Sequence, residues 1–309
     1  MVKKIKVYNN FKISRLHKNS IILIGNFDGL HQGHQKLFKL AKKFKKKKYK
    51  IGVITFDPIP KMFFNKSISN YRLSNLNQKL ILLKKFNVDF VIKKKFDLNF
   101  SKIKAFNFIK YILHKKIEPK YIFVSNNFRF GHKRKGNVNV LKNFQLKYNY
   151  KLINPKPLTK KNKIISSTLI RKLLQNGDLN TANKILKKNW SIEGIVEKGR
   201  MMGKKIGFPT CNIDIKNYIV AKPGVYAVKV KIQNIRKSYK GIANLGYRPT
   251  FNQRKILLEV NIFNFSGNLY NKKLSVEFLK FIRGEKKFNG VDDLRNQIRK
   301  DLFIAKKVK

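Results

Sequence analysis

The hydrophobic pattern of this 309-residue chain changes its period close to residue 186. Before that point short apolar runs alternate with amphipathic segments, which is typical of the strands and helices of a doubly wound parallel α/β sheet. After it, apolar and polar residues alternate between Gly, Asn and Pro turns, which indicates the antiparallel strands of a small barrel. The pattern therefore predicts two domains, residues 1–186 and residues 187–309.

The individual elements can be placed from their patterns. In the first half we expect strands at 21–24, 51–55, 88–92 and 121–124, and helices at 33–48, 76–86 and 103–115. In the second half we expect strands at 225–232, 257–265 and 274–282, then a helix at 291–305 that packs on the barrel through Leu294, Ile298 and Leu302. Parallel sheets bind ligands beyond the carboxyl ends of their strands, so the segment after Ile24 is the first candidate site.

The charge of the chain is strongly positive, with 72 Lys and Arg residues against 15 acidic ones and a formal net charge of +57. Such a field attracts nucleic acid or anionic lipid whatever the role of the protein, so charge alone does not assign a function. The excess is spread along the chain together with Asn, Ile and Phe, as AT-rich codons would produce. We interpret the Lys42–Lys50 run as the solvated end of a helix, and keep a basic nucleic-acid binder as an alternative.

The sequence favours a reducing compartment. Its one cysteine, Cys211, excludes an intramolecular disulfide framework and a cysteine-based zinc site. The charged start lacks the apolar run of a signal peptide, and no stretch reaches the length of a membrane span. We therefore expect a cytoplasmic protein that is neither exported nor inserted in a membrane.

The segment that follows Ile24 reads Gly-Asn-Phe-Asp-Gly-Leu-His-Gln-Gly-His and leads into a helix. Glycines let a backbone approach a phosphate, and a helix N-terminus attracts anions. His31 and His34, one helical turn apart, can share one phosphate, although two such histidines could also be a metal pair or polar surface. The predicted phosphate-binding residues of this segment are Gly25, Phe27, Asp28, Gly29 and Gly33, with His31 and His34 as the catalytic pair.

A second phosphate-binding candidate, Ile-Ser-Ser-Thr-Leu-Ile-Arg, occupies residues 165–171. Its hydroxyls precede a helix and Arg171 follows within the first turn. Ser and Thr are also ordinary N-caps, so this segment by itself is ambiguous. We predict that Ser167, Thr168 and Arg171 contribute to a phosphate site.

The second half carries glycines at every fourth position, Gly199, Gly203 and Gly207, followed by Pro-Thr-Cys-Asn. Glycines spaced in this way could form a phosphate-binding loop or simply mark bends of a barrel. Thr210 and Asn212, two residues apart on an extended strand, point the same way and offer the hard oxygens that Mg²⁺ accepts. We therefore predict an Mg²⁺·ATP site at this strand, with Thr210 and Asn212 as metal ligands.

The two motif sets together resemble one family. The His-x-Gly-His signature and the 165–171 segment resemble the adenylyltransferase half of bacterial bifunctional riboflavin kinase/FAD synthetases, and Gly-Phe-Pro-Thr-Cys-Asn resembles their kinase signature, which usually has Ala at the place of Cys211. Further similar segments are Thr55–Pro58, Asn127–Gly131 with Arg134 and Gly136, Gly241–Thr250, Leu258–Val260, Leu269–Asn271 and Phe281–Glu285.

The resemblance implies roles for individual residues. In the first half, His31 and His34 would hold ATP phosphates, Ser167, Thr168 and Arg171 would close over the triphosphate, and Asn127 would lie at the flavin phosphate. In the second half, Glu259 would be the base for the ribityl hydroxyl. A carboxylate is chemically suited to that step, and its place opposite Leu258 and Val260 leaves the barrel mouth or solvent as its two possible environments.

In its adenylyltransferase half this chain departs from the family pattern at two places. Ser125-Asn126-Asn127 stand where Gly-Asp-Asp or a similar sequence is common, which removes negative charge, and Ile164 stands where an Arg is usual, with Lys163 beside it. These changes motivate an alternative in which the kinase persists and the adenylyltransferase site has decayed.

The preferred interpretation is a two-activity enzyme of flavin cofactor synthesis. A Rossmann-like nucleotidyltransferase domain with the His-x-Gly-His motif would be followed by an antiparallel riboflavin kinase barrel with a C-terminal helix. The enzyme would use ATP with Mg²⁺ to convert riboflavin to FMN, and would then transfer AMP to FMN, giving FAD and pyrophosphate. Its expected partners are these small molecules, with no specific nucleic acid and no membrane, and its oligomeric state is left open.

Overall fold

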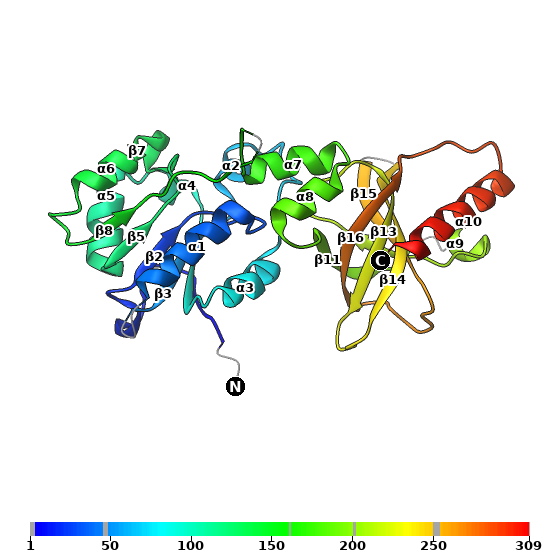
Figure 1. Ribbon diagram of the computed structural model, residues 1–309, viewed down its shortest axis with the longest axis horizontal. Coiled ribbons are helices and arrows are strands. Elements are labelled where there is room, and N and C mark those ends of the chain that lie inside the picture. Colours follow the sequence, from blue (N-terminus) through cyan, green and yellow to red (C-terminus); the bar gives the residue numbers. More distant parts are fainter. Residues whose placement is uncertain (1–3, 46–48, 161, 200–201, 250–253, 309) are drawn as a thin grey trace. The chain divides into compact units, whose positions relative to one another are not determined.

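The computed structural model describes residues 4–45, 49–160, 162–199, 202–249 and 254–308. The chain divides into two compact units, the first formed by Met1–Ser69 and Leu76–Ser166 and the second by Asn70–Asn75 and Ser167–Lys309 (Figure 1). Lys46–Lys48 of the lysine run, Arg200–Met201 and Thr250 lie outside the described residues.

A six-stranded sheet forms the centre of the first unit. Its order is β1-β4-β3-β2-β5-β8, and each neighbouring pair is parallel. The strands are β1 (Lys6–Tyr8), β2 (Ile21–Ile24), β3 (Ile51–Asp57), β4 (Phe90–Lys95), β5 (Tyr121–Phe123) and β8 (Lys151–Ile153). The doubly wound α/β fold is confirmed. Its strand order reverses between β2 and β5, which is where such sheets bind their ligands.

Helices cover both faces of this sheet, because successive apolar residues of a strand point to opposite sides. Ile21 and Leu23 pack with helix α1 (Gln32–Phe44) and helix α3 (Leu76–Lys85). Ile22 and Ile24 pack with the π-helix η2 (Phe108–Ile117) and with α6 (Val138–Asn143). The shorter elements are η1 (Arg15–His17), α2 (Pro60–Phe64), α4 (Leu98–Ser101), α5 (Ala105–Asn107), β6 (Arg129–Phe130), η3 (His132–Arg134), β7 (Gly136–Asn137), β9 (Thr159–Lys160) and β10 (Lys163–Ile164).

Some element boundaries differ from the expected ones. The first helix ends at Phe44, earlier than expected, because Lys45 takes extended backbone angles. The helix expected at 103–115 begins at Ala105, because Lys104 is extended, and continues as a π-helix to Ile117. β4 begins two residues later than expected, after a left-handed turn at Asn87.

The second unit contains a closed antiparallel barrel of order β11-β12-β15-β14-β13-β16, as the period-two pattern predicted. The strands are β11 (Ser191–Glu197), β12 (Cys211–Asp214), β13 (Gly224–Ile232), β14 (Ser238–Pro249), β15 (Arg254–Ile262) and β16 (Lys273–Arg283), and a short helix α9 (Met202–Lys205) lies between β11 and β12. The strand expected at 257–265 ends at Ile262, since Asn264 adopts a left-handed turn conformation.

Helix α10 (Val291–Lys307) closes one side of the barrel and appears in red in Figure 1. Leu302 and the buried Ala305 pack against Val225, Ala227 and Ile242 of the barrel strands. The expected final helix and its packing against the barrel are therefore confirmed. No helix in the described part of the chain combines the length and apolar character needed to cross a membrane.

The second unit also includes helices α7 (Ser167–Gln175) and α8 (Leu179–Leu186) and the distant segment Asn70–Asn75. Within this unit the indole Nε1 of buried Trp190 donates to Leu73 O at 3.1 Å, and Asn75 Nδ2 donates to Glu193 Oε2 at 3.2 Å. By packing, residues 167–186 thus belong with the barrel. The domain boundary after residue 186 stays a prediction.

Candidate active sites

The first candidate site lies where the strand order of the sheet reverses. The glycine-rich segment Gly25–His34 leaves the carboxyl end of β2, and Ser125–Asn127 follow the carboxyl end of β5, its neighbour. The exposed Asn127 accepts a hydrogen bond at Oδ1 from Ser125 Oγ at 3.0 Å, and Asn126 Oδ1 accepts one from Asn154 Nδ2 at 3.2 Å. The fold therefore brings two of the predicted segments to the ends of two neighbouring strands.

The backbone of the Gly25–His34 segment is held in unusual conformations. Phe27 and Leu30 have positive φ angles of 47° and 45°, which non-glycine residues seldom adopt. Both side chains are buried in the core beneath the segment, and this packing offsets the backbone strain. A Cβ at Gly33 would lie 3.2 Å from the His31 ring and 3.3 Å from Ile165 O, so glycine permits the close approach of Ile165.

His31 and His34 are adjacent, as their spacing predicted. His31 is the N-cap of α1, its Nδ1 accepts from His34 N at 3.4 Å, and the two rings stack with centroids 3.7 Å apart. Burial holds the pKa of His34 well below its usual range, and the charges of His31 and Lys79 lower that pKa further. Among the described residues no partner reaches the buried Nδ1 of His34. His34 can thus offer a neutral imidazole group to a phosphate.

Lys79 is a cation beside this site that sequence reasoning missed. Its side chain is buried on α3, and its Nζ donates to Thr55 Oγ1 at 3.2 Å. Thr55 in turn donates to Asn26 O at 3.3 Å, within the glycine-rich segment. The available signal was helical spacing, since Lys79 precedes the buried Leu83 by one turn and therefore lies on the buried face of α3.

The three predicted phosphate-site residues of α7 have different environments. Ser167 is half-buried and Thr168 is exposed. Arg171 is buried, its Nε donates to Tyr71 O at 2.7 Å, and its guanidinium lies 3.6 Å from the centre of the Tyr71 ring. Ile164 is 56% exposed, so no apolar packing fixes its position.

The second candidate site is a cavity of about 390 Å³ between the outer face of the barrel and helix α10, where Val225 and Ile242 pack towards this helix. Each barrel strand contributes one residue to a row that crosses neighbouring strands, in which each residue is the direct register partner of the next. The row consists of Glu197, Asn212, Glu259, Asn244, Val225 and Arg283, all of which line the cavity. Glu259 therefore faces this cavity, which is neither the interior of the barrel nor open solvent, the two environments that its alternation had left open.

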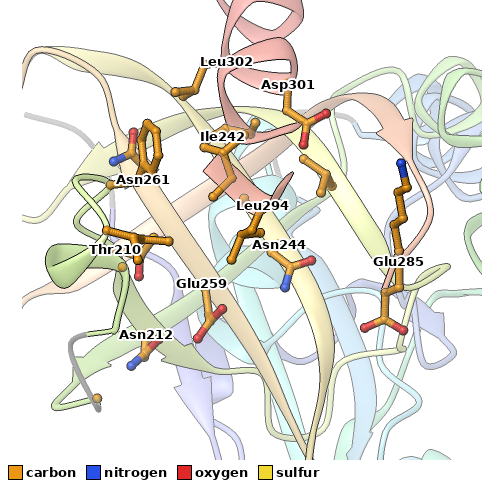
Figure 2. Close-up of a pocket in the computed structure, with 18 of the residues that line it drawn as sticks. Thr210, Asn212, Ile242, Asn244, Glu259, Asn261, Glu285, Leu294, Asp301 and Leu302 are labelled. Atoms are coloured by element: carbon orange, nitrogen blue, oxygen red, sulfur yellow. The ribbon is translucent and has the colours of Figure 1, made fainter. Parts of the chain in front are cut away.

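The predicted ligand residues surround Glu259. Figure 2 shows Thr210 and Asn212 on one side of Glu259 and Asn244 on the other. A Cβ at Gly199 would collide with Asn212 Nδ2, and one at Gly203 would lie 3.1 Å from Thr210 Oγ1 and collide with Phe208 O. Gly207 has a φ of +90°, which favours glycine. Two of the glycines thus permit close approach to the Thr210–Asn212 segment, and the third permits a turn.

Asn212 is buried, with 8% of its surface exposed. Within the described residues its buried Oδ1 has no hydrogen-bond partner. A buried amide oxygen left without a partner is costly unless a ligand supplies one. Cys211, the next residue along the strand, does not line the cavity, and burial raises the pKa of its thiol to about 11.

Helix α10 forms the other wall of the cavity through Leu294, Ile298 and Leu302. A buried ion pair ties this helix to β16, in which Arg283 Nε lies 2.9 Å from Asp301 Oδ2 and a second guanidinium nitrogen lies 2.8 Å from the same oxygen. Gln297 Nε2 also donates to Asp301 Oδ1 at 2.9 Å. Sequence reasoning missed Glu197, Asn244 and this ion pair, because their proximity depends on strand register.

Together these features are those of a two-domain, nucleotide-dependent transferase, with two stacked histidines where a doubly wound sheet reverses its strand order and a cavity beside the barrel that is lined by an acid and by threonine and asparagine side chains. A family model of FAD synthetase matches residues 13–169, and one of riboflavin kinase matches residues 186–309.

Relatives that match over nearly the whole chain agree with the two family models. The bifunctional riboflavin kinase/FMN adenylyltransferase of Buchnera aphidicola subsp. Schizaphis graminum is 41% identical, with 99% of this chain and 98% of that protein covered. The protein of the same description from Escherichia coli strain K12 is 33% identical over 93% and 91%. A crystal structure described as a macrolide-efflux protein from Streptococcus pneumoniae superposes with a TM-score of 0.85 at 29% identity, covering 98% and 99%. The chain belongs to the family of bifunctional riboflavin kinase/FMN adenylyltransferases.

Proposed function

We propose that the barrel cavity is the site of riboflavin phosphorylation and that the Gly25–His34 segment is the site of FMN adenylylation. The observation that carries the first assignment is the row Asn212, Glu259, Asn244 on three neighbouring strands, which faces a cavity and includes an amide oxygen without a protein partner. The second assignment is supported by the stacked histidines at the reversal of strand order.

In the kinase reaction Glu259 acts as the general base. Its carboxylate takes the proton of the terminal ribityl hydroxyl of riboflavin as that oxygen attacks the γ-phosphorus of ATP. The bond between the γ-phosphorus and the bridging oxygen breaks, and ADP leaves with the electron pair. A rigid barrel strand suits this role, because it fixes the carboxylate relative to the ATP site.

Thr210 and Asn212 would hold Mg²⁺ in this reaction. The partnerless Oδ1 of Asn212 and the Thr210 hydroxyl fit a hard cation that prefers oxygen ligands. When bound, the cation neutralises charge on the transferred phosphoryl group. Gly199 and Gly203 leave room beside these two side chains, and Gly207 completes the loop.

In the adenylyl transfer a phosphate oxygen of FMN attacks the α-phosphorus of ATP, and pyrophosphate leaves. His31 and His34 stabilise the charge that builds on the α-phosphate, since the N-terminus of α1 and the two imidazoles direct donors at it. The backbone of Gly25, Phe27, Asp28, Gly29 and Gly33 surrounds the phosphates. Asn127 contacts the flavin phosphate, and Ser167, Thr168 and Arg171 contact the triphosphate.

The physiological setting is part of the same proposal. The enzyme works in the cytoplasm on ATP, riboflavin and FMN, without a specific nucleic-acid or membrane partner. The alternative of a kinase with a decayed adenylyltransferase site predicts that the reaction stops at FMN.

The test is to incubate purified protein with riboflavin, ATP and Mg²⁺ and to separate the flavins over time. Wild-type protein should give FMN and then FAD. His31→Ala should stop at FMN, while Glu259→Gln should leave riboflavin unchanged and still convert supplied FMN to FAD. Glu277→Gln serves as the matched control, because Glu277 pairs with Lys231 at 2.6 Å and does not line the cavity.

Any different result of this assay shows which of the two site assignments is wrong. FMN without FAD in the wild type supports the decayed-site alternative, and unchanged riboflavin overturns the kinase assignment. Loss of both activities in either active-site variant contradicts two separate sites.

A further inference from the structure

Glu197 is an acidic residue of the barrel cavity for which the proposed kinase reaction has no use. It is the last residue of β11 and the direct register partner of Asn212 on β12. Residues directly opposite one another in an antiparallel pair have Cβ atoms about 4.5–5.5 Å apart on the same face of the sheet. Both line the cavity, so the Glu197 carboxylate extends into the space that the Asn212 amide also faces.

The segment that follows Glu197 brings the two strands still closer together. Two residues after Glu197, at Gly199, the position of a side chain is already occupied by the amide nitrogen of Asn212. The same amide carries the oxygen that has no hydrogen-bond partner among the described residues. A buried, partnerless oxygen beside a carboxylate is the arrangement that a hard cation would complete.

The two acids of the row lie on opposite sides of Asn212, with Glu197 on β11 and Glu259 on β15. Adjacent strands are about 4.8 Å apart, so the two backbones are separated by roughly 10 Å. Glu259 must keep its lone pairs free to accept a proton, whereas Glu197 has no such constraint. One carboxylate can therefore bind a cation while the other acts as base.

We propose that Glu197 is a carboxylate ligand, together with Thr210 and Asn212, of the divalent cation that accompanies ATP in the kinase site. This inference rests on the proposed kinase site and adds a charged ligand to two neutral ones. Among the described residues no group of three or more His, Cys, Asp and Glu side chains gathers to form a self-sufficient metal site. A cation held by one carboxylate, an amide and a hydroxyl would take its remaining oxygens from ATP and water, as Mg²⁺ commonly does.

The test compares Glu197→Gln with wild-type protein in two measurements. The first is the Mg²⁺ concentration that gives half-maximal riboflavin phosphorylation, which should rise at least tenfold, with turnover at saturating Mg²⁺ changed less than threefold. The second is Mn²⁺ binding in the presence of ADP, followed without turnover by the electron paramagnetic resonance of free Mn²⁺, which should weaken at least tenfold at one site.

Two further variants make the result decisive. Glu277→Gln, which removes an acid outside the cavity, should change neither quantity. Glu197→Asp keeps the charge but shortens its reach, so it should raise the half-maximal Mg²⁺ concentration to an intermediate value. If Glu197→Gln fails to fold, the Mg²⁺ dependence of Glu197→Asp tests whether Glu197 is a ligand of the cation.

The proposal is overturned if both Glu197 variants keep the wild-type Mg²⁺ dependence and Mn²⁺ affinity. Wild-type protein that forms no FMN at any Mg²⁺ concentration would instead refute the proposed kinase site itself. The two failures are thus distinguishable in one set of assays.

Discussion

At the scale of single residues, Asn212 takes its position in the barrel cavity because Gly199 has no side chain. The amide of Asn212 lies where the Cβ of any other residue would be. In Gly199→Ala the flexible Asn212 side chain has to move, and a displacement of about 1 Å at a reacting site can cost roughly 100-fold in rate. We expect riboflavin phosphorylation to fall by about that factor, with little change in the thermal midpoint.

The matched control for Gly199→Ala is Gly290→Ala. Gly290 has nothing within 4 Å of the position of a Cβ and a φ of −167°, so alanine fits there. Initial rates of FMN formation distinguish the two variants. FAD formation from supplied FMN is measured on each preparation as its second activity. Equal kinase rates would show that Asn212 need not be held where the structure has it.

His34 gives a prediction of pH-dependent stability. Its pKa lies well below the usual 6.5 in the folded protein because of burial, then His31, then Lys79. Below pH 6.5 the unfolded chain therefore takes up a proton that the folded chain does not. The free energy of unfolding should fall as pH is lowered through that window, by at most about 1.4 kcal/mol per pH unit.

Comparison with His34→Gln between pH 7.5 and pH 5.5 isolates this contribution. The thermal midpoint of wild-type protein should fall more steeply on acidification than that of the variant. Parallel curves would mean that His34 takes up its proton at a similar pH in the folded and unfolded chain.

At the level of elements, α10 is fastened to β16 by Arg283 and Asp301. Asp301 is 2% exposed, and its loss leaves a partly buried guanidinium without its carboxylate. Removing one partner of a buried pair costs roughly 3–5 kcal/mol. Since the Arg283 side chain is 22% exposed, Asp301→Asn should lower the free energy of unfolding by about 3 kcal/mol, the lower end of that range.

Asp292→Asn on the same helix is the control for Asp301→Asn. The Asp292 side chain is 90% exposed and pairs with Arg295 at 3.3 Å, so its loss should cost less than about 1 kcal/mol. Urea unfolding of both variants measures the difference. Similar losses would mean that the buried pair does not fasten the helix.

The sequence predicted the type of the helices and strands better than it predicted where they begin and end. Ile21–Ile24 is apolar throughout and buried on both faces, so its identity as a central parallel strand followed from sequence. The end of α1 and the start of α5 did not, because backbone angles at Lys45 and Lys104 depend on surroundings distant in the chain. The π-helical form of Phe108–Ile117 left no signal in the apolar periodicity.

For the whole molecule, the structure predicts that the barrel depends on residues outside 187–309. Asn183 of α8 accepts from Trp190 N at 2.8 Å and donates to Phe278 O at 3.0 Å. A fragment of residues 167–309 should therefore exceed one of residues 187–309 in free energy of unfolding by at least about 2 kcal/mol, counting about 1 kcal/mol for each hydrogen bond.

Urea unfolding followed by the fluorescence of Trp190, the one tryptophan of the chain, measures both fragments. Both lack Leu73, the acceptor for the Trp190 indole, so both should be less stable than the second unit within the full chain. Equal stability of the two fragments would place α7 and α8 outside the folding unit of the barrel.

The sequence by itself determined the two fold classes and the candidate segments, because hydrophobic period and local motifs such as Gly25–His34 are written in neighbouring residues. Only the tertiary structure decided which residues share a site. Glu197, Asn212, Glu259 and Asn244 come from four strands and meet through register, and Lys79 reaches Asn26 through Thr55 on another strand. Register and burial depend on contacts between residues far apart in the chain, and no local pattern encodes them.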